Sequence, residues 1–205
     1  SSYVFMRLDF LDLAYGAETA STTGISDALN IYIMIGWSNA PGYQCWVPDY
    51  VKYNGKGIYL SDYCWVLAIA LYDTYNYKVY DYNWNVKLQN SGLQIAFNSQ
   101  WDLLEIAIPT SLLQSYGWTP TTRVWAKIAT TIVYSSSGSV LADIMPNNIA
   151  DSGSYYSWSG AVFSDANVGT AKLIIVHHGN QHLADNRGLN NPSSKNSYWY
   201  ILTIH

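Results

Sequence analysis

The spacing of hydrophobic positions predicts β-strands along almost the whole chain. Residues 3–10 alternate between a set that includes Arg7 and Asp9 and a set that is wholly apolar, Val4, Met6, Leu8 and Phe10. This period of two is typical of a half-buried strand. Residues 28–37 are almost wholly apolar, which predicts a strand covered on both faces. Further strands are expected at residues 65–73, 77–86, 92–100, 102–109, 123–134 and 161–166.

Turn-forming residues and one helix divide these segments. Clusters of Asn, Gly, Ser and Pro separate them, and the short connection 74–76 suits a hairpin. Only residues 109–117 indicate a helix: Pro109 suits its start, Thr110 or Ser111 its N-cap, and Gly117 its end. The sequence therefore predicts an all-β fold, an antiparallel β-sandwich of jelly-roll or immunoglobulin-like type with one short helix. We expect Leu112 and Leu113 of this helix to close one end of the sandwich.

The character of the chain changes near residue 165. We therefore expect a β-sandwich module at 1–165 and a C-terminal extension of one strand and a polar loop at 166–205. The last segment, 197–205, suits a strand or the first turns of a helix. The apolar strand 172–176 cannot stand alone, because a lone buried strand leaves its backbone donors and acceptors unpaired. We expect it to pair with the sandwich of its own chain or with that of a neighbouring copy.

Composition argues against two classes of partner. Only 12% of the residues are charged, and Lys and Arg together number 10, whereas Tyr (19) and Trp (9) are abundant. The net charge is −4, and binding of nucleic acid, which needs clustered Lys and Arg, is not expected. No apolar run reaches the ~18 residues of a membrane span.

Cys45 and Cys64 are the only cysteines of the chain. They flank a Gly- and Tyr-rich segment that is long for a loop inside a compact domain. Two unrelated thiols are the alternative, but a disulfide would close this segment and remove roughly 3 kcal/mol of unfolded-state entropy. We therefore expect a Cys45–Cys64 disulfide. It would place the protein outside the reducing cytoplasm, as a secreted protein, or in a hyperthermophile, where intracellular disulfides persist.

Aromatic side chains are the candidate binding residues. Sugar rings offer apolar C–H faces that lie well against Trp and Tyr, whose N–H and O–H groups also bond to hydroxyls. Four of the candidate rings lie in the segment between the cysteines, where a core position is hard to arrange, and two lie in the predicted strand 77–86. Packing within the protein is the alternative for both groups. The candidate carbohydrate-binding residues are Trp46, Tyr50, Tyr53, Tyr59, Tyr82 and Trp84.

The sequence shows neither a complete set of metal ligands nor a recognisable pair of catalytic residues. His177, His178 and His182 stand close together, but zinc needs three or four ligands, and only Asp185 is near them. They suit polar loop residues, or a sugar-binding loop in a larger enzyme. No cofactor is expected. The alternative is a calcium ion, which Asp73, Asn76, Asp81 and Asn83 would bind through their side-chain oxygens. A glycosidase needs two carboxylates at a fixed separation, and the spacing in the sequence does not single out a pair. The candidates are Asp9, Asp12, Asp102, Glu105 and Asp143.

The order of motifs resembles one family of sandwiches. "SSYVFMRLDF", "NIYIMIGW", "ALYDTYNYKVYDYNWNV", "WDLLEIAIPTSLL" and "VLADIMPNN" follow one another as in the DOMON-like and family 9-like carbohydrate-binding modules attached to amylopullulanases and glucodextranases. The specific elements are Glu105 with Ile108 and Pro109 before the helix, and Asp143 before Pro146. Members often carry Asp where this chain has Met34. The segment "LIIVHHGNQHL" is similar to the first strand and loop of a glycoside hydrolase family 57-like domain, without its His-Gln-Pro motif.

The resemblance and the aromatic side chains together predict a secreted, non-catalytic module. It would bind an α-glucan, or pack against and support the catalytic domain of a parent glycoside hydrolase; the chain is not expected to be an enzyme by itself. The alternative is an extracellular filament or surface-layer subunit, for which a Tyr-, Ser- and Asn-rich chain of low charge is also suited. In such a filament a strand from one copy would complete the sheet of the next, by donor-strand exchange.

Overall fold

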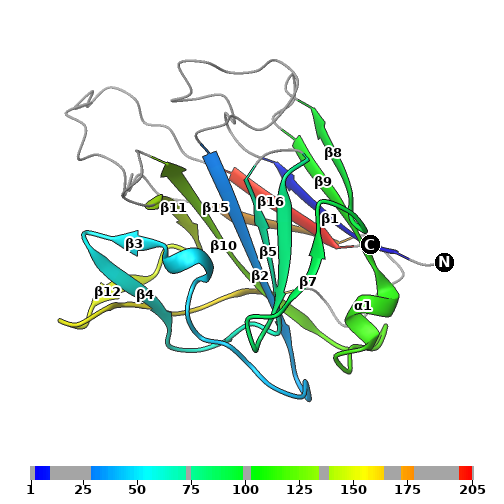
Figure 1. Ribbon diagram of the computed structural model, residues 1–205, viewed down its shortest axis with the longest axis horizontal. Helices are drawn as coiled ribbons and strands as arrows, with labels where there is room; N and C mark the ends of the chain where they lie inside the picture. The colour runs from blue at the N-terminus through cyan, green and yellow to red at the C-terminus, as the bar shows by residue number, and fades with distance from the viewer. Residues whose placement is uncertain are drawn as a thin grey trace.

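The computed structural model describes residues 3–9, 29–72, 75–98, 103–133, 139–163, 172–177 and 199–204. Within these residues the chain is an all-β sandwich of mostly antiparallel strands with one short α-helix, α1 (Thr110–Gln114), which confirms the predicted fold class (Figure 1). A single 3-10 turn, η1 (Pro48–Tyr50), lies in the segment between the two cysteines.

The smaller of the two sheets brings together the first and last described strands of the chain. Its strands lie in the order β15 (Lys172–His177), β16 (Trp199–Ile204), β1 (Tyr3–Asp9), β9 (Leu103–Pro109), β8 (Gln94–Asn98). All of its pairs are antiparallel, and Arg7 of β1 lies between Glu105 of β9 and Thr203 of β16. The strand 172–176 therefore pairs through β16 with the sandwich of its own chain, one of the two predicted arrangements. The boundary between 1–165 and 166–205 stays a prediction.

The larger sheet is built around β2 (Leu29–Trp37), which lies between β10 (Val124–Val133) and β5 (Leu67–Leu71). Beyond β5 come β6 (Tyr77–Asp81) and β7 (Val86–Gln89), so the predicted single strand 77–86 is two strands joined by a turn. On the other side of β10 come β11 (Ser139–Met145), β3 (Lys52–Tyr53), β4 (Lys56–Leu60), β13 (Tyr156–Trp158), β12 (Ile149–Asp151) and, paired with β10, β14 (Val162–Phe163). The pairs β11–β3 and β13–β4 are parallel.

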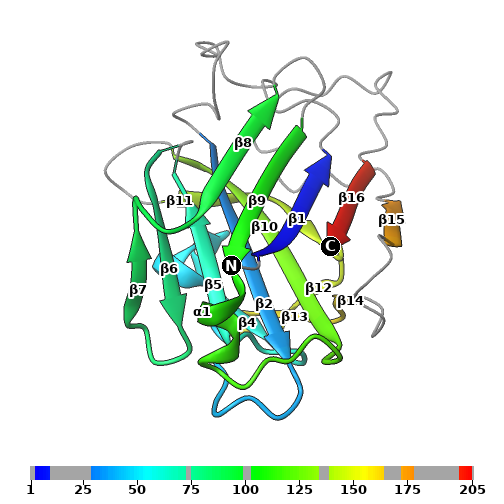
Figure 2. The ribbon, with the colours of Figure 1, turned by 90° about the vertical axis from the view of Figure 1, so that its right-hand side faces the viewer.

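An inner core fills the space between the two sheets. Figure 2 shows the small sheet in front of the central strands of the large one. Val4, Met6 and Leu8 of β1 are buried there, as the period of two predicts, whereas Phe5 between them is exposed. Alternate residues of β2 and β9 meet them: Ile31, Ile33, Ile35, Leu104, Ile106 and Ile108.

An outer core covers the opposite face of the large sheet. Tyr32 and Met34, on the other face of β2, are also fully buried, which confirms that this strand is covered on both faces. The cover comes from the segment between the cysteines, from Trp65 directly after it and from β13, through Val47, Val51, Ile58, Leu60, Trp65 and Trp158. The expectation that core positions are hard to arrange in this segment is therefore wrong, because an apolar outer face of the large sheet lies beneath it.

The short helix follows β9 directly and closes one end of the inner core (Figure 1). Leu113 is buried, and Leu112 packs against the same core while partly exposed. Gly117 ends the helical segment at φ 84°, a value that favours glycine. The predicted N-cap is wrong: Pro109 occupies the cap position without a side-chain bond, and Thr110 and Ser111 lie inside the helix.

Candidate functional site

A disulfide joins Cys45 to Cys64, as predicted, with the two Cα atoms 4.6 Å apart. It fastens the start of the covering segment to its end. Backbone hydrogen bonds reinforce this link: Leu60 donates to the Cys45 carbonyl over 2.6 Å, and Gln44 and Trp65 exchange bonds of 2.8 and 2.9 Å. Residues 44–47 therefore run beside β4 as an extended segment.

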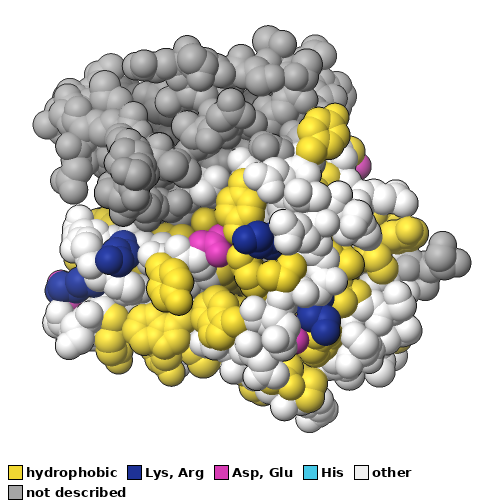
Figure 3. Space-filling model, in the orientation of Figure 1, with side chains coloured by type: hydrophobic (Ala, Val, Ile, Leu, Met, Phe, Trp, Pro, Cys, Tyr) yellow, Lys and Arg dark blue, Asp and Glu magenta, His cyan; other side chains and the backbone are white. Residues whose placement is uncertain are grey.

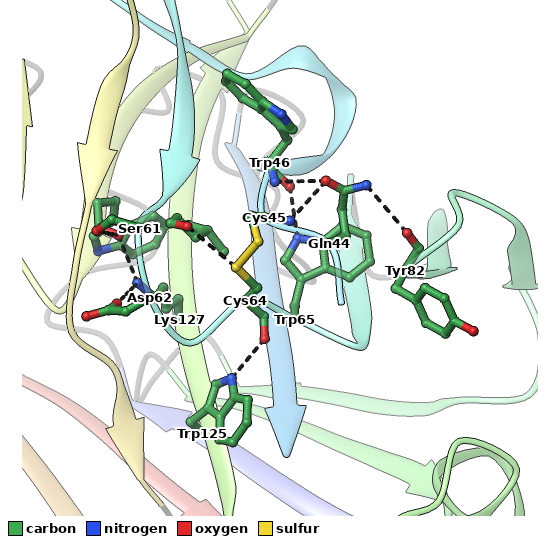
Figure 4. The surroundings of a disulfide bond; sticks show 12 residues. Gln44, Cys45, Trp46, Ser61, Asp62, Cys64, Trp65, Tyr82, Trp125 and Lys127 are labelled. Atoms are coloured by element: carbon green, nitrogen blue, oxygen red, sulfur yellow. Dashed lines mark hydrogen bonds and ion pairs between the residues drawn. A yellow bond between two sulfur atoms is a disulfide. The ribbon is translucent and has the colours of Figure 1, made fainter. Parts of the chain in front are cut away.

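Trp46 lies on this segment and begins an aromatic cluster. Its backbone carbonyl accepts a 2.9 Å bond from the indole of buried Trp65, and its N–H donates to the Gln44 side chain (Figure 4). The ring covers Gly57 of β4, where an added Cβ would come within 3.1 Å of the indole. The backbone of Trp46 is thus fixed while its side chain stays on the surface, 41% exposed.

Trp46, Tyr59 and Tyr155 form what we call the first aromatic surface. The ring centroids of Trp46 and Tyr59 are 5.1 Å apart, those of Trp46 and Tyr155 5.8 Å, and those of Tyr59 and Tyr155 5.4 Å. All three pairs meet edge to face. Figure 3 shows hydrophobic side chains gathered on the face of the molecule over β3, β4 and η1.

The polar atoms of this surface are available to a ligand. Among the described residues, the Trp46 indole N–H and the hydroxyls of Tyr59 and Tyr155 have no hydrogen-bond partner. Each ring can therefore offer an apolar face or edge together with a donor group. This combination is the one that sugar rings need, because their C–H faces and hydroxyls alternate around the ring.

A surface ion pair joins β4 to β12. Lys56 of β4 donates to both carboxylate oxygens of Asp151 on β12, over 2.8 and 2.7 Å, and this contact lowers the pKa of Asp151. Lys56 also lies 5.6 Å from the centroid of the Tyr156 ring, which meets Tyr53 edge to face at 4.7 Å. Tyr53 therefore lies at the rim of the outer core, on the face of β4 opposite to the one that Trp46 covers.

The other predicted binding residues do not join this surface. Tyr50 is 92% exposed on η1. Tyr82 packs against the inner core and meets Tyr116 edge to face, whereas Trp84 lies over Trp65 of the outer core. The strand ends at Asp81 and Trp84 has φ 66°, so alternation does not continue past residue 81. The six predicted residues thus occupy several separate places, and only Trp46 and Tyr59 touch.

Two tyrosines and a carboxylate form a hydrogen-bonded group beside η1. Tyr72 and Tyr80 both donate to the carboxylate of Asp49, over 2.5 and 2.8 Å, and their hydroxyls are 3.3 Å apart. Burial and the neighbouring carboxylate raise the pKa of Tyr72, and raise that of Tyr80 to about 12 despite the opposing bond with Tyr72. Both phenols are therefore neutral donors at any physiological pH.

Asp81, one of the proposed calcium ligands, is occupied by the protein. Its carboxylate accepts bonds from the backbones of Asn83 and Asn85, from the Asn85 side chain, and from the hydroxyl of Tyr116. Burial alone would raise the pKa of Asp81, but these bonds outweigh it and lower the pKa. The described residues include no group of three or more His, Cys, Asp or Glu side chains suited to a metal. Asp73 lies outside the described residues.

An ion pair between a buried lysine and a partly exposed aspartate lies on the other side of the disulfide region. Lys127 of β10 is 0% exposed, and its Nζ is 3.0 Å from an oxygen of Asp62 and 3.0 Å from the Trp158 carbonyl (Figure 4). Burial lowers the pKa of Lys127, and Asp62 opposes that change. Gly160 donates its N–H to the second Asp62 oxygen. The pair therefore links β10 to the cover of the outer core.

The remaining candidate residues lie in separate strands or outside the residues that the structure describes. His177 ends β15, and His178 and His182 lie outside the described residues, as do Asp12 and Asp102. Glu105 lies in β9, as predicted, on an exposed position. Asp9 and Asp143 lie in β1 and β11. The described part of the chain contains no helix long and apolar enough to cross a membrane.

Sequence reasoning missed Tyr155, which completes the first aromatic surface. Tyr155 comes from a turn more than a hundred residues after Trp46, and it reaches the site because β13 pairs with β4. The local sequence "GSYYSW" shows abundant aromatics but gives no sign of this pairing. No protein-family model, curated protein or solved structure matches the chain.

Proposed function

We propose that the protein is a non-catalytic carbohydrate-binding module, and that the first aromatic surface holds the glycan. The observation that carries this proposal is the cluster of exposed Trp46 with the partly buried rings of Tyr59 and Tyr155, whose N–H and O–H groups have no partner among the described residues. Rigid aromatic side chains lose little entropy on binding. The disulfide and the bond from Trp65 hold the Trp46 backbone before a ligand arrives, which lowers the cost of binding further.

The rings of the first aromatic surface support a neutral glycan, although one exposed cation, Lys52, lies on the same face of the β3–β4 pair as Gly57, which the Trp46 ring covers. Neutral glucose units need only ring faces and hydrogen bonds, which Trp46, Tyr59 and Tyr155 offer. An α-glucan, the ligand that the family resemblance implies, fits this requirement. The disulfide supports an oxidising compartment such as the extracellular space.

The test compares Trp46→Ala with Tyr50→Ala on granular starch, an insoluble α-glucan. Trp46→Ala should lower retention on the order of 10²-fold, with little change in melting temperature because its ring is on the surface. Tyr50→Ala removes an equally aromatic but isolated ring and should leave retention unchanged. Undiminished retention of Trp46→Ala would contradict the proposal. Undiminished retention with a large loss of stability would assign Trp46 to packing.

We propose, as the second candidate, a subunit that assembles by exchange of strands between copies. The supporting observation is the position of β15 and β16, which extend the small sheet beyond β1. Met6, Arg7 and Leu8 of β1 pair with Ile204, Thr203 and Leu202 of β16. A β16 from a neighbouring copy would form the same backbone bonds, as in strand addition to a sheet edge.

A cross-link distinguishes the two arrangements. Arg7→Cys and Thr203→Cys place two thiols at paired positions of β1 and β16, within reach of a disulfide. Assembly by exchange predicts covalent ladders on a non-reducing gel at high protein concentration. Monomers alone at every protein concentration would overturn this candidate. The control for random oxidation is Phe5→Cys combined with Thr203→Cys, because Phe5 does not pair with Thr203.

A further inference from the structure

A second group of surface rings lies around the start of β10. Tyr43, Tyr63, Trp125 and Phe163 form what we call the second aromatic surface. Tyr43 and Trp125 lie with centroids 6.2 Å apart and planes only 24° from parallel. Tyr63 meets Trp125 at 5.7 Å and Phe163 at 4.9 Å, both edge to face. Tyr43 and Tyr63 remain 43% and 42% exposed, so this is an apolar surface open to solvent rather than a core.

The backbone holds these rings in fixed positions. The Trp125 indole donates to the Cys64 carbonyl over 3.0 Å, and the Tyr43 hydroxyl donates to the Trp37 carbonyl over 3.0 Å. Gly36 leaves room for the indole, because a Cβ there would overlap its Nε1. The two nearly parallel rings are therefore rigid before any ligand binds, which keeps the entropic cost of stacking low.

Polar groups beside the rings are free to contact a ligand. The guanidinium of Arg123 lies 4.3 Å from the Phe163 centroid and has no carboxylate partner among the described residues. The hydroxyl of Tyr63 likewise has no hydrogen-bond partner within the described ranges. A planar fork of donors beside a stacking platform suits the vicinal hydroxyls of a sugar.

The two aromatic surfaces are connected through the disulfide. Cys45 is followed by Trp46 of the first surface, and Cys64 is preceded by Tyr63 of the second. Figure 4 shows Trp46 and Trp125 on opposite sides of the sulfur atoms. Both surfaces are thus anchored to one rigid link, and their relative placement does not depend on a flexible loop.

We propose that the second aromatic surface is a second saccharide-binding site, which takes the same neutral polysaccharide as the first. The inference rests on the proposed function, since both sites are assigned the same ligand class. A polymer offers many equivalent sugar units, so a module with two fixed sites gains affinity for an insoluble glycan without new contacts. Arg123 and Tyr63 supply the hydrogen bonds, and Tyr43 with Trp125 the stacking platform.

The test measures stoichiometry with a short ligand and retention with a long one. Maltotriose titrated into the native chain should bind at two sites, and Tyr63→Ala and Trp46→Ala should each leave one. Retention on granular starch should fall on the order of 10²-fold in either single variant, because each loses the gain from two linked sites. Arg123→Ala should weaken the second site alone, and Tyr50→Ala should change neither measurement.

The outcomes separate this inference from the proposed function. One site in the native chain, lost in Trp46→Ala and kept in Tyr63→Ala, overturns the second site and leaves the proposed function standing. One site lost in Tyr63→Ala and kept in Trp46→Ala supports the second surface and overturns the assignment of the first. No binding of maltotriose or starch overturns both. Melting curves of each variant show whether a loss of binding comes from unfolding.

Discussion

The inner and outer cores lie on the two faces of one sheet but are closed in different ways. The inner core is enclosed by two sheets whose strands pair over long ladders, such as the seven residue pairs of β1 and β9. The outer core is covered by β-strands of two to five residues, turns, one disulfide and one ion pair with a buried lysine. Backbone pairing thus maintains the first core, and side-chain links maintain the second. We infer that the outer core opens more easily than the inner one.

Two tryptophans allow the largest test of this difference. Trp37 of the inner core and Trp158 of the outer core are both fully buried, and each indole donates to a backbone carbonyl, that of Tyr116 and that of Pro146. Truncation of a buried Trp costs about 3–5 kcal/mol. Trp37→Ala should lower the global free energy of unfolding by this amount, in urea titrations. Trp158→Ala should lower it by less, because the inner core survives opening of the cover.

Hydrogen exchange on the same pair of variants locates the change. Trp158→Ala should raise the exchange of amides in 44–66 and leave β1 and β9 protected. Equal loss of protection in both cores would show that they unfold as one unit, and would remove the distinction drawn above.

Reduction of the disulfide has the next largest effect. Cys45→Ala with Cys64→Ala removes a constraint on a 19-residue separation, worth roughly 3 kcal/mol. The loss should fall on the outer core, and binding at both aromatic surfaces should weaken because Trp46 and Tyr63 flank the two cysteines. The measurement is exchange protection in β4 against β9, with and without reductant in the unsubstituted chain. Unchanged protection of β4 would contradict this role of the disulfide.

Alkaline pH tests each core through one tyrosine. Burial and a carboxylate raise the pKa of Tyr80, in the outer core, and of Tyr116, in the inner core, to about 12 from an ordinary value of 10.0. The folded state therefore holds these protons more tightly than the unfolded state. Their stabilisation is complete below pH 10 and is lost as pH rises from 10 to 12, on the order of 2 kcal/mol for each group.

Phe substitutions assign this loss. Tyr116→Phe and Tyr80→Phe should each flatten the decrease in unfolding free energy between pH 10 and 12, measured by urea titration at successive pH values. A variant whose pH dependence matches that of the unsubstituted chain would show that its tyrosine does not contribute.

Local patterns in the sequence predicted the parts that local physics determines. The alternation of Val4, Met6 and Leu8 predicted β1, and Pro109 with Gly117 predicted the helix ends. The outer core was not predicted, because Val47 and Ile58 lie among turns with no period. The first aromatic surface was predicted only in part, since Tyr155 reaches Trp46 through a parallel pairing of strands distant in sequence.

Gly36 affects how accurately β2 finds its native register against β10 when the chain folds. Because residues 31–35 of β2 are hydrophobic on both faces, a shift by one residue would exchange Tyr32 and Met34 with Ile31 and Ile33, and the only polar groups moved to the other core would be the Asn30 side chain and the Tyr32 hydroxyl. Hydrophobicity therefore does little to forbid the slipped pairing. Shape forbids it: Gly36 lies opposite Trp125, and a slip would bring the side chain of Ile35 or Trp37 against that indole. The absence of a side chain at Gly36 thus fixes the register of β2 against β10.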